Sequence, residues 1–484
     1  MNRIIFNILG GPLLGGAVFL SGCGSKGGSD PTPQPPVPPV SGPSQVALWL
    51  TSANQTMKFQ KSTLVLNFKA ASGQNPTIRV DTTQTYQSID GFGYTLTGGS
   101  ATLINQLGAA GRAALLKELF ATDATNIGTS YLRISIGASD LSDHVFTYDD
   151  VPAGETDVAL AKFSLEPEKK DLIPVLKEIL AISPELKILG SPWSAPAWMK
   201  DNSSLKGGSL KPEYYGAYAK YLVKYLQAMQ AEGIRVDAIT LQNEPLNPYN
   251  NPSMVMTAEQ QAELIGSFVG PALKAANLTT RIILYDHNTD RIDYPLAILG
   301  NALAYPYVDG SAFHLYAGNI EALSTVHNAH PTKNVYFTEQ WVGGPGNFSG
   351  DFSWHINNLI IGATRNWSRN VLEWNLAADQ NYGPHTDGGC TTCLGALTIN
   401  GSTITRNVAY YTVAHAAKFV RPGSVRIDTN VPNNLPNVAF KTPSGQKVLI
   451  VQNNGSATQT FDIGYRDKVV TSTLAGGTVG TYVW

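Results

Sequence analysis

Residues 212–244, PEYYGAYAKYLVKYLQAMQAEGIRVDAITLQNE, contain one full unit of the pattern that decides the fold. The first part, Pro212 to Ala231, predicts an amphipathic helix because its apolar side chains recur at helical spacing, at Tyr215, Tyr218, Leu222 and Leu226. The last part, Ala238 to Glu244, is a short apolar run that predicts a buried strand. Helices that alternate with buried strands indicate an α/β fold with a parallel sheet.

The same alternation extends on both sides, from about residue 86 to residue 415. A second helical stretch is Glu259 to Ala276. The apolar runs are Ser88 to Leu96, Tyr131 to Gly137, Lys187 to Trp193, Ala238 to Glu244, Arg281 to Asn288, Ser311 to Tyr316, Asn334 to Trp341 and Asn370 to Leu376. Eight such units predict a closed (β/α)8 barrel, the TIM-barrel architecture, over residues 86–415.

Strand patterns without helices flank this region. They are Val46 to Leu50, Thr63 to Phe68 and Thr77 to Val80 before it, and, from Val425 on, Asn437 to Phe440, Lys447 to Val451, Gln459 to Ile463 and Gly480 to Trp484 after it. Neither set could bury both faces of its strands alone. We therefore expect residues 45–85 and 416–484 to form one attached β-sandwich.

The first residues predict export and a lipid anchor. Residues 1–22 combine Arg3 with an apolar, Gly-rich run and end in Leu20-Ser21-Gly22 before Cys23, which resembles a bacterial lipoprotein signal. A Pro-rich linker over residues 23–44 would hold the folded part away from the membrane. The alternatives are a plain secretory peptide or a short membrane anchor. Because Gly24, not Asp, follows Cys23, we expect the outer membrane, on its periplasmic or surface face.

Composition points to a neutral polar ligand. Of 484 residues, 43% are hydrophobic and only 14% are charged, and the formal net charge is −2. An average globular protein has about 25% charged residues. The absence of a basic excess argues against a nucleic-acid partner, and we expect a monomer.

After Cys23 the remaining cysteines are Cys390 and Cys393. A C-x-x-C pair can be a redox site, half of a zinc site or a short disulfide. No second pair exists to complete a four-cysteine zinc site, and an exported protein favours the disulfide. No H-E-x-x-H motif or His/Cys cluster is present, so we predict no metal and no cofactor.

The ends of the predicted strands identify candidate functional residues, because active sites of such barrels lie at the carboxyl ends of the strands. Glu244 ends the fourth strand and Glu339 the seventh. The other candidates at this mouth are Arg133, Trp193, Asn243, His314, Tyr316, Trp341, Trp374 and Asn375. For Trp193 and His314 a place in the core is the alternative, and Asp140 and Asp286 are interpreted as structural.

Two carboxyl groups with aromatic neighbours are the residue types needed to bind a sugar and cleave a glycosidic bond. One protonates the leaving oxygen, and the other attacks carbon or activates water. We expect Arg133 to keep Glu339 ionised as the nucleophile and a more buried Glu244 to hold the proton as acid/base. Asn243 could bind the sugar 2-hydroxyl.

These motifs, in order, resemble glycoside hydrolase family 30, the glucosylceramidase and β-1,6-glucanase family, over about residues 86–484. They are Asp90-Gly91-Phe92-Gly93, Leu132-Arg133-Ile134, Gly190 to Pro196, Gln242-Asn243-Glu244-Pro245, Phe313-His314-Leu315-Tyr316, Thr338-Glu339 and Glu373-Trp374-Asn375-Leu376. The resemblance implies a barrel with a side β-sandwich and net retention of configuration. It assigns the acid/base to Glu244 and the nucleophile to Glu339. It also implies that Arg133, Trp193, Asn243, His314, Tyr316 and Trp374 line the sugar site.

The resemblance also bears on the substrate. Glucosylceramidases of this family carry an Asp soon after the first strand, where this sequence has Gly98. The loop from Asn381 to Cys393 looks more like the β-1,6-glucanase branch. We therefore expect β-1,6-glucan, with glucosylceramide, another β-glucoside or xylan as alternatives. A non-catalytic glycan-binding lipoprotein or an adhesin is the rival class, but both glutamates are present and no repeats are evident.

Overall fold

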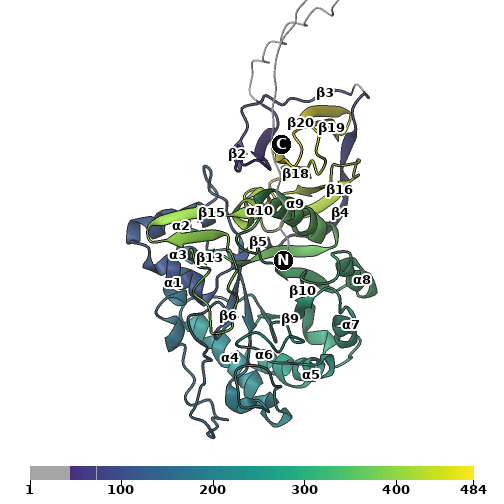
Figure 1. Cartoon of the computed structure of the whole chain (residues 1–484). Helices are drawn as coiled ribbons and strands as arrows, with labels where there is room; N and C mark the ends of the chain where they lie inside the picture. Colours follow the sequence, from purple (N-terminus) through teal and green to yellow (C-terminus); the bar gives the residue numbers. More distant parts are fainter. Residues whose placement is uncertain (1–43, 72) are drawn as a thin grey trace, which may run out of the picture. The chain divides into compact units, whose positions relative to one another are not determined.

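The computed structural model describes residues 44–71 and 73–484 (Figure 1). The predicted signal, Cys23 and almost all of the linker lie outside the described residues. The described chain forms a closed eight-stranded barrel, a ten-stranded sheet built from both ends of the chain, and a small three-stranded sheet. The expected fold class, a TIM barrel with an attached β-sandwich, is confirmed.

All eight predicted runs form barrel strands, and every neighbouring pair is parallel. They are β5 (Gly91–Thr95), β6 (Tyr131–Ile136), β7 (Lys187–Pro192), β8 (Ala238–Thr240), β9 (Arg281–Asn288), β10 (Val308–His314), β11 (Asn334–Glu339) and β12 (Ser368–Asn375). Parallel strands are covered on both faces, which explains their nearly continuous apolar sequences.

The inside of the barrel has two layers of different chemistry. A buried apolar cluster with one residue from each of seven strands fills the lower part: Tyr131, Leu189, Ala238, Ile283, Ala312, Tyr336 and Leu372. Side chains alternate between the faces of a strand, so residues two positions further along point inward again. On six of the strands that second layer is Arg133, Ser191, Thr240, His314, Thr338 and Trp374, all of them buried. The polar layer therefore lies directly below the mouth.

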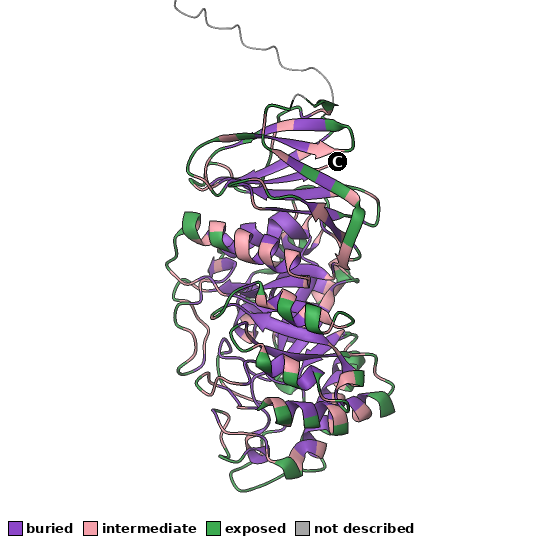
Figure 2. Cartoon of the chain, turned by 90° about the vertical axis from the view of Figure 1, so that its right-hand side faces the viewer, coloured by how far each residue is buried: buried purple, intermediate pink, exposed green. Residues whose placement is uncertain are grey.

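Helices surround the barrel, with buried faces toward the strands and exposed faces toward solvent (Figure 2). The predicted helix at 212–231 is α4 (Tyr215–Ala231) after a 3-10 turn (Pro212–Tyr214), and the one at 259–276 is α5 (Ala258–Glu263), a π-helical segment (Leu264–Val269) and α6 (Gly270–Ala275). The others are α1 (Gly98–Gln106), α2 (Ala109–Phe120), α3 (Leu172–Ile182), α7 (Asp293–Leu299), α8 (Ala322–Ala329), α9 (Phe348–His355), a π-helical segment (Ile356–Ala363) and α10 (Val408–Ala417). Among the described residues, no helix has the length and apolar character needed to cross a membrane.

The ten-stranded sheet runs in the order β2-β1-β21-β18-β17-β16-β4-β19-β20-β3. Its strands are β1 (Ala47–Thr51), β2 (Gln60–Lys61), β3 (Lys69–Ala70), β4 (Thr77–Ser88), β16 (Val425–Thr429), β17 (Asn437–Lys441), β18 (Lys447–Gln452), β19 (Gln459–Tyr465), β20 (Lys468–Leu474) and β21 (Val479–Val483). Its two halves share one buried core, which includes Leu48, Ile78, Leu449 and Phe461. The first strand, β1, pairs with the last, β21, which also pairs with β18. The small sheet contains β13 (Ala377–Ala378), β14 (Leu397–Asn400) and β15 (Thr403–Arg406).

The sandwich differs from the sequence prediction in several strands: the short β2 and β3 were not predicted, and β4 continues past Val80 to Ser88. The predicted strand Thr63 to Phe68 is not a strand. Leu64 is 58% exposed there, and the backbone N–H groups of Gln45 and Val46 both donate to the Leu66 carbonyl, which breaks the regular ladder. Strand β20 was not predicted, because its second half, Thr-Ser-Thr, carries little apolar signal.

One buried imidazole joins the barrel to the sandwich. His415 on α10 contacts the hydroxyl of Thr481 on β21 through Nδ1, and that of Thr51 on β1 through Nε2, both at 2.8 Å. The ring is fully buried, and burial lowers the pKa of His415 to about 3. The joint therefore requires a neutral histidine.

We predict that this joint makes the fold sensitive to acid. The unfolded chain binds the His415 proton near pH 6.5 and the folded chain only near pH 3, so stability declines from this cause as the pH falls between those values. At pH 4.5 the loss is on the order of 3 kcal/mol. His415→Gln should be less stable than the parent at pH 7 but lose less stability on acidification, as measured by urea unfolding at both pH values. Equal losses in both proteins would contradict the prediction.

Candidate active site

A cleft of about 620 Å³ lies at the carboxyl ends of the barrel strands. Drug-sized and sugar-sized ligands commonly occupy cavities of about 300–1,000 Å³. Seven residues predicted from the sequence line the cleft: Trp193, Asn243, Glu244, Tyr316, Glu339, Trp341 and Trp374. Six further lining residues were not predicted to bind ligand: Asp140, Leu246, Asn247, Asn250, His287 and Asn288.

The two glutamates reach this cleft from different backbone settings. Glu339 is the last residue of β11. Glu244 follows β8 in a loop and has a left-handed backbone, with φ of 45°. Its backbone N–H donates to the Asp286 carbonyl at 3.0 Å, which holds it in this conformation. Left-handed backbone is unfavourable for non-glycine residues and is frequently found at functional sites.

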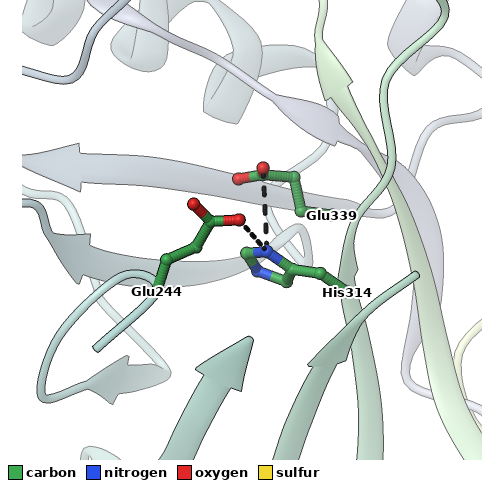
Figure 3. Close-up of side chains that lie close together, drawn as sticks. All are labelled: Glu244, His314 and Glu339. Atoms are coloured by element: carbon green, nitrogen blue, oxygen red, sulfur yellow. Dashed lines mark hydrogen bonds and ion pairs between the residues drawn. The ribbon is translucent and has the colours of Figure 1, made fainter. Parts of the chain in front are cut away.

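The side chains of Glu244 and Glu339 face each other across His314 (Figure 3). A carboxylate oxygen of each lies within 4.8 Å of the other. Retaining glycosidases have carboxyl groups about 5–5.5 Å apart, whereas inverting enzymes need about 6.5–9.5 Å to admit a water molecule. The separation is therefore that of a nucleophile and an acid/base.

The same three side chains form the one group, in the described part of the chain, whose ligand atoms could gather around a metal ion. Arg133 Nη1 already donates to Glu339 Oε2 at 2.5 Å, and His314 Nδ1 lies 3.2 Å from Glu244 Oε1. The carboxylates thus have protein cations as partners, and the arrangement suits acid/base chemistry.

Asp286 lies beneath the glutamates and connects its own strand, β9, with five other barrel strands. Its carboxylate accepts from Arg133 Nη2 at 2.8 Å and from His314 Nε2 at 3.1 Å. It also accepts from three hydroxyl groups, those of Ser191, Thr240 and Thr338, at 2.6–2.9 Å. The charge of Arg133 and these bonds outweigh complete burial and hold the pKa of Asp286 well below its usual range.

A β-bulge puts Asp286 inside the barrel. Tyr285 pairs with Ala312 and His287 with Phe313, so Asp286 is an extra residue in β9. Tyr285 and Asp286 have φ of 74° and 66°, respectively. Strict alternation from Ile283 would point Tyr285 inward, but the bulge sends the Asp286 carboxylate there instead.

Arg133 is a second centre of the polar layer. Besides Glu339 and Asp286, its guanidinium donates to Asn243 Oδ1 at 2.6 Å. The rings of Trp193 and Trp374 cover it, with centroids 4.8 and 5.8 Å from Cζ. Arg133 therefore fixes Glu339 and Asn243 from below, shielded from solvent.

Comparison with known proteins agrees with this geometry. The family description "Glycosyl hydrolase family 30 TIM-barrel domain" matches residues 89–420, and "Glycosyl hydrolase family 30 beta sandwich domain" matches residues 423–482. The chain belongs to glycoside hydrolase family 30. As a member of this family it is a glycoside hydrolase, and its substrate is a glycan or other glycoside.

Similar family 30 proteins include two fungal enzymes and a solved structure. The chain is 37% identical to "Endo-1,6-beta-D-glucanase neg1" of Aspergillus fumigatus, covering 81% of this chain and 82% of the relative. It is 34% identical to "Endo-1,6-beta-D-glucanase BGN16.3" of Trichoderma harzianum, covering 86% and 89%. The structure described as "The endo-beta1,6-glucanase BT3312" superposes with a TM-score of 0.85 at 35% identity, covering 91% of this chain and 99% of that one.

Electrostatics of the family 30 site place a proton on His314. Burial favours the neutral ring, but the negative charge of Glu339 and the contacts with Asp286 and Glu244 outweigh it and raise the pKa of His314 to about 9. Because both ring nitrogens then carry hydrogen, Nδ1 donates to Glu244 and Nε2 to Asp286. His314 is fully buried, so solvent does not weaken this ion pair.

The pKa directions of the two glutamates are the reverse of those expected from the sequence. Arg133 does contact Glu339, but burial outweighs the charges of His314 and Arg133 and raises the pKa of Glu339. Burial would also raise the pKa of Glu244, but the hydrogen bond and charge of His314 dominate and lower it to about 2. The sequence argument considered the contact of Arg133 with Glu339 and did not include the contact of His314 with Glu244.

Three of the predicted substrate-binding residues do not line the cleft of this family 30 protein. Arg133 and His314 lie fully buried beneath it. The Asn375 amide donates to the carbonyls of Ala377 and Cys393, both at 3.4 Å. Arg133 and His314 contact the two glutamates from below, and Asn375 contacts the backbone behind the wall.

The cleft also contains residues that sequence reasoning passed over. Asp140, interpreted as structural, lines the cleft, and burial raises its pKa to about 7. A Cβ at Gly98 would lie 2.9 Å from Ser142 Oγ, so this position leaves little room for a larger side chain. His287 and Asn288 end β9, and the strand-end rule used for the other candidates would have found them.

Cys390 and Cys393 form a disulfide, with S–S 2.11 Å, as favoured from the sequence. It belongs to the cleft wall, where Cys393 is buried with Leu141, Trp193 and Trp374. The Cys390 backbone N–H donates to the Asp140 carboxylate. The bridge thus shapes the wall beside Glu339.

We predict that His314 sets the acidic limb of the pH–rate profile. His314→Asn removes a positive charge that lowers the pKa of both glutamates, so both should rise. Loss of an adjacent opposite charge shifts a carboxyl pKa by about 1–3 units. The acidic limb of kcat/KM should therefore move to higher pH by about this amount, while His327→Asn, far from the cleft, should not move it. An unshifted limb in His314→Asn would show that the imidazole carries no charge there.

Proposed function

We propose that this family 30 hydrolase is a retaining endo-β-1,6-glucanase, with Glu339 as nucleophile and Glu244 as acid/base. The observation that carries the proposal is the carboxylate pair within 4.8 Å at the base of the cleft. The choice of β-1,6-glucan and of internal cleavage is supported by the similar proteins named above.

In the first step, Glu339 attacks the anomeric carbon while the glycosidic C–O bond breaks. Glu244 gives a proton to the departing oxygen, which in a β-1,6-linked glucan is O6 of the next glucose. Arg133 and the Tyr316 hydroxyl, which donates to Glu339 Oε1 at 3.0 Å, orient the nucleophile. The product is a covalent glycosyl–Glu339 ester and a shortened chain with a free O6 hydroxyl.

In the second step, Glu244 has become a carboxylate and accepts a proton from water. The water oxygen bonds to the anomeric carbon as the ester bond to Glu339 breaks. Two inversions at one carbon give net retention. The Asn243 amide, fixed by Arg133, is placed to bond the sugar 2-hydroxyl, an interaction that strengthens at the transition state.

His314 supplies the proton that Glu244 needs. Its Nδ1 lies 3.2 Å from Glu244 Oε1, within reach for direct transfer. A sugar over the cleft removes water from Glu244 and thereby favours the protonated acid. Asp286, which stays ionised, retains the other ring hydrogen and holds the ring in place.

The first test of this proposal is product analysis of the purified protein on β-1,6-glucan, with glucosylceramide and β-1,4-xylan in parallel. We expect a series of β-1,6-linked oligosaccharides from the glucan and no cleavage of the other two. Glucose alone would indicate cleavage from the chain end. Release of ceramide without cleavage of the glucan would replace the proposal with a glucosylceramidase.

Two variants separate the roles of the glutamates in the same assay. Glu339→Gln should lose activity by on the order of 10³-fold or more on every substrate while its circular dichroism stays unchanged. Glu244→Gln should slow the glucan far more than an activated aryl glucoside, because the aryl group leaves without a proton. Equal slowing would argue against Glu244 as the acid.

We also propose that the protein is a monomer attached to the outer membrane through a lipid on Cys23. The support for the anchor is the Leu20-Ser21-Gly22-Cys23 sequence with Gly24 after it, and the monomer is the expectation from the sequence. In a bacterial host, a clickable fatty acid should label the parent protein in the outer-membrane fraction. Cys23→Ser should lose the label, and the protein solubilised in detergent should sediment as a single chain. An unlabelled parent protein would rule the anchor out.

A further inference from the structure

The two walls of the catalytic cleft differ in chemistry. Beside Glu339 the wall consists of Trp341, Trp374 and the disulfide, with the Asp140 carboxyl group held by the Cys390 backbone N–H. Beside Glu244 the wall has one apolar side chain, Leu246, and four polar ones, Asn247, Asn250, His287 and Asn288. None of these four carries a fixed charge, so this wall offers hydrogen bonds to neutral groups.

The polar wall lies where the leaving group must be. Two of its amides, those of Asn247 and Asn250, donate to Glu244 Oε2 at 2.7 and 3.3 Å. Because the acid/base touches the leaving oxygen, residues around it border the leaving group and not the sugar that Glu339 attacks.

His287 has a buried ring nitrogen that lacks a hydrogen-bond partner within the part of the chain that the structure describes. Its side chain is 8% exposed, and its Nδ1 has no hydrogen-bond partner among the described residues. Burial lowers the pKa of His287, so the ring is neutral and has one donor and one acceptor nitrogen. Buried polar atoms are rarely left without a partner, which makes this ring a candidate to bind ligand.

The loop that carries the two amides is held in place before any ligand arrives. Asn251 Nδ2 donates to the Asp387 carbonyl at 2.9 Å, and Thr386 Oγ1 donates to the Asn251 carbonyl at 2.5 Å. Farther along, the Met256 backbone N–H donates to the Pro245 carbonyl at 2.9 Å. A fixed set of polar groups binds without a large cost of ordering.

We propose that Asn250, His287 and Asn288 form a binding subsite for the leaving sugar and select a neutral, polyhydroxylated leaving group over an alkyl one. An alkyl chain would leave these amide and imidazole groups without partners, and sites built for hydrogen bonds reject such ligands strongly. The inference rests on the proposed glycosyl-enzyme mechanism, and it assigns the leaving-group specificity of the same cleft.

The covalent intermediate allows this subsite to be tested directly. An acceptor alcohol in the subsite can replace water in the second step. Its oxygen forms the new C–O bond to the anomeric carbon, the ester to Glu339 breaks, and Glu244 takes the hydroxyl proton. The ratio of capture by two acceptors thus measures subsite preference without any influence of the donor's own leaving group.

The experiment uses the full chain with 2,4-dinitrophenyl β-gentiobioside as donor and either gentiobiose or 1-pentanol as acceptor. We expect gentiobiose to capture the intermediate more efficiently than pentanol. Asn250→Ala and His287→Leu should each reduce this preference by about tenfold, roughly the loss of one hydrogen bond. The matched controls are Asn126→Ala at a half-buried site and His144→Leu at an exposed site, both outside the cleft, and they should retain the parent preference.

The outcomes distinguish the subsite from the proposed function. Equal capture of both acceptors by the parent protein, or an unchanged preference in both cleft variants, would overturn the subsite. Preference for gentiobiose in a protein that does not cleave β-1,6-glucan would support the subsite and reject the proposed substrate. Lack of any turnover of the donor would overturn both.

Discussion

The active site depends on one buried carboxylate. Asp286 on β9 accepts hydrogen bonds from side chains on β6, β7, β8, β10 and β11, so six of the eight barrel strands meet at a group that does not line the cleft. A buried carboxylate is tolerated only when it is paired and fully hydrogen-bonded. Arg133 and His314 provide the opposite charges, and each of them also contacts one of the two glutamates at the cleft. Because Asp286 must be paired, Arg133 and His314 are held in place, and through them the positions of Glu339 and Glu244 are fixed.

Much of this could be read from the sequence because strands alternate regularly and barrel sites lie at strand ends. Glu339, Tyr316, Trp193 and Trp374 reach the cleft for that reason. The bulge at Tyr285 and Asp286 could not be foreseen, since one extra residue leaves no mark in the apolar pattern. Neither could the depth of His314, which depends on the polar layer around it. Asn247 and Asn250 belong to an irregular loop, and no periodicity predicts where such side chains point.

The group that carries the hydrogen, His314, is not the group that faces the cleft, Glu244. His314 holds the hydrogen in a fully buried position between Asp286 and Glu244, while Glu244 faces the cleft. A residue that meets substrate can thus remain ionised until water is displaced from it. Glu339 has a different partner, because Arg133 beneath it carries a permanent charge and is covered by two indole rings.

The pairing of β1 with β21 has a consequence for synthesis. The chain enters the sandwich, leaves to build the whole barrel, and returns, so β1 cannot meet its partner until β21 has left the ribosome. Strand β21 also separates β1 from β18. Loss of β21 would open a gap within the sheet and expose two unpaired edges, which are prone to aggregation. The sheet is therefore completed only after the barrel, with both glutamates of the cleft, has been translated.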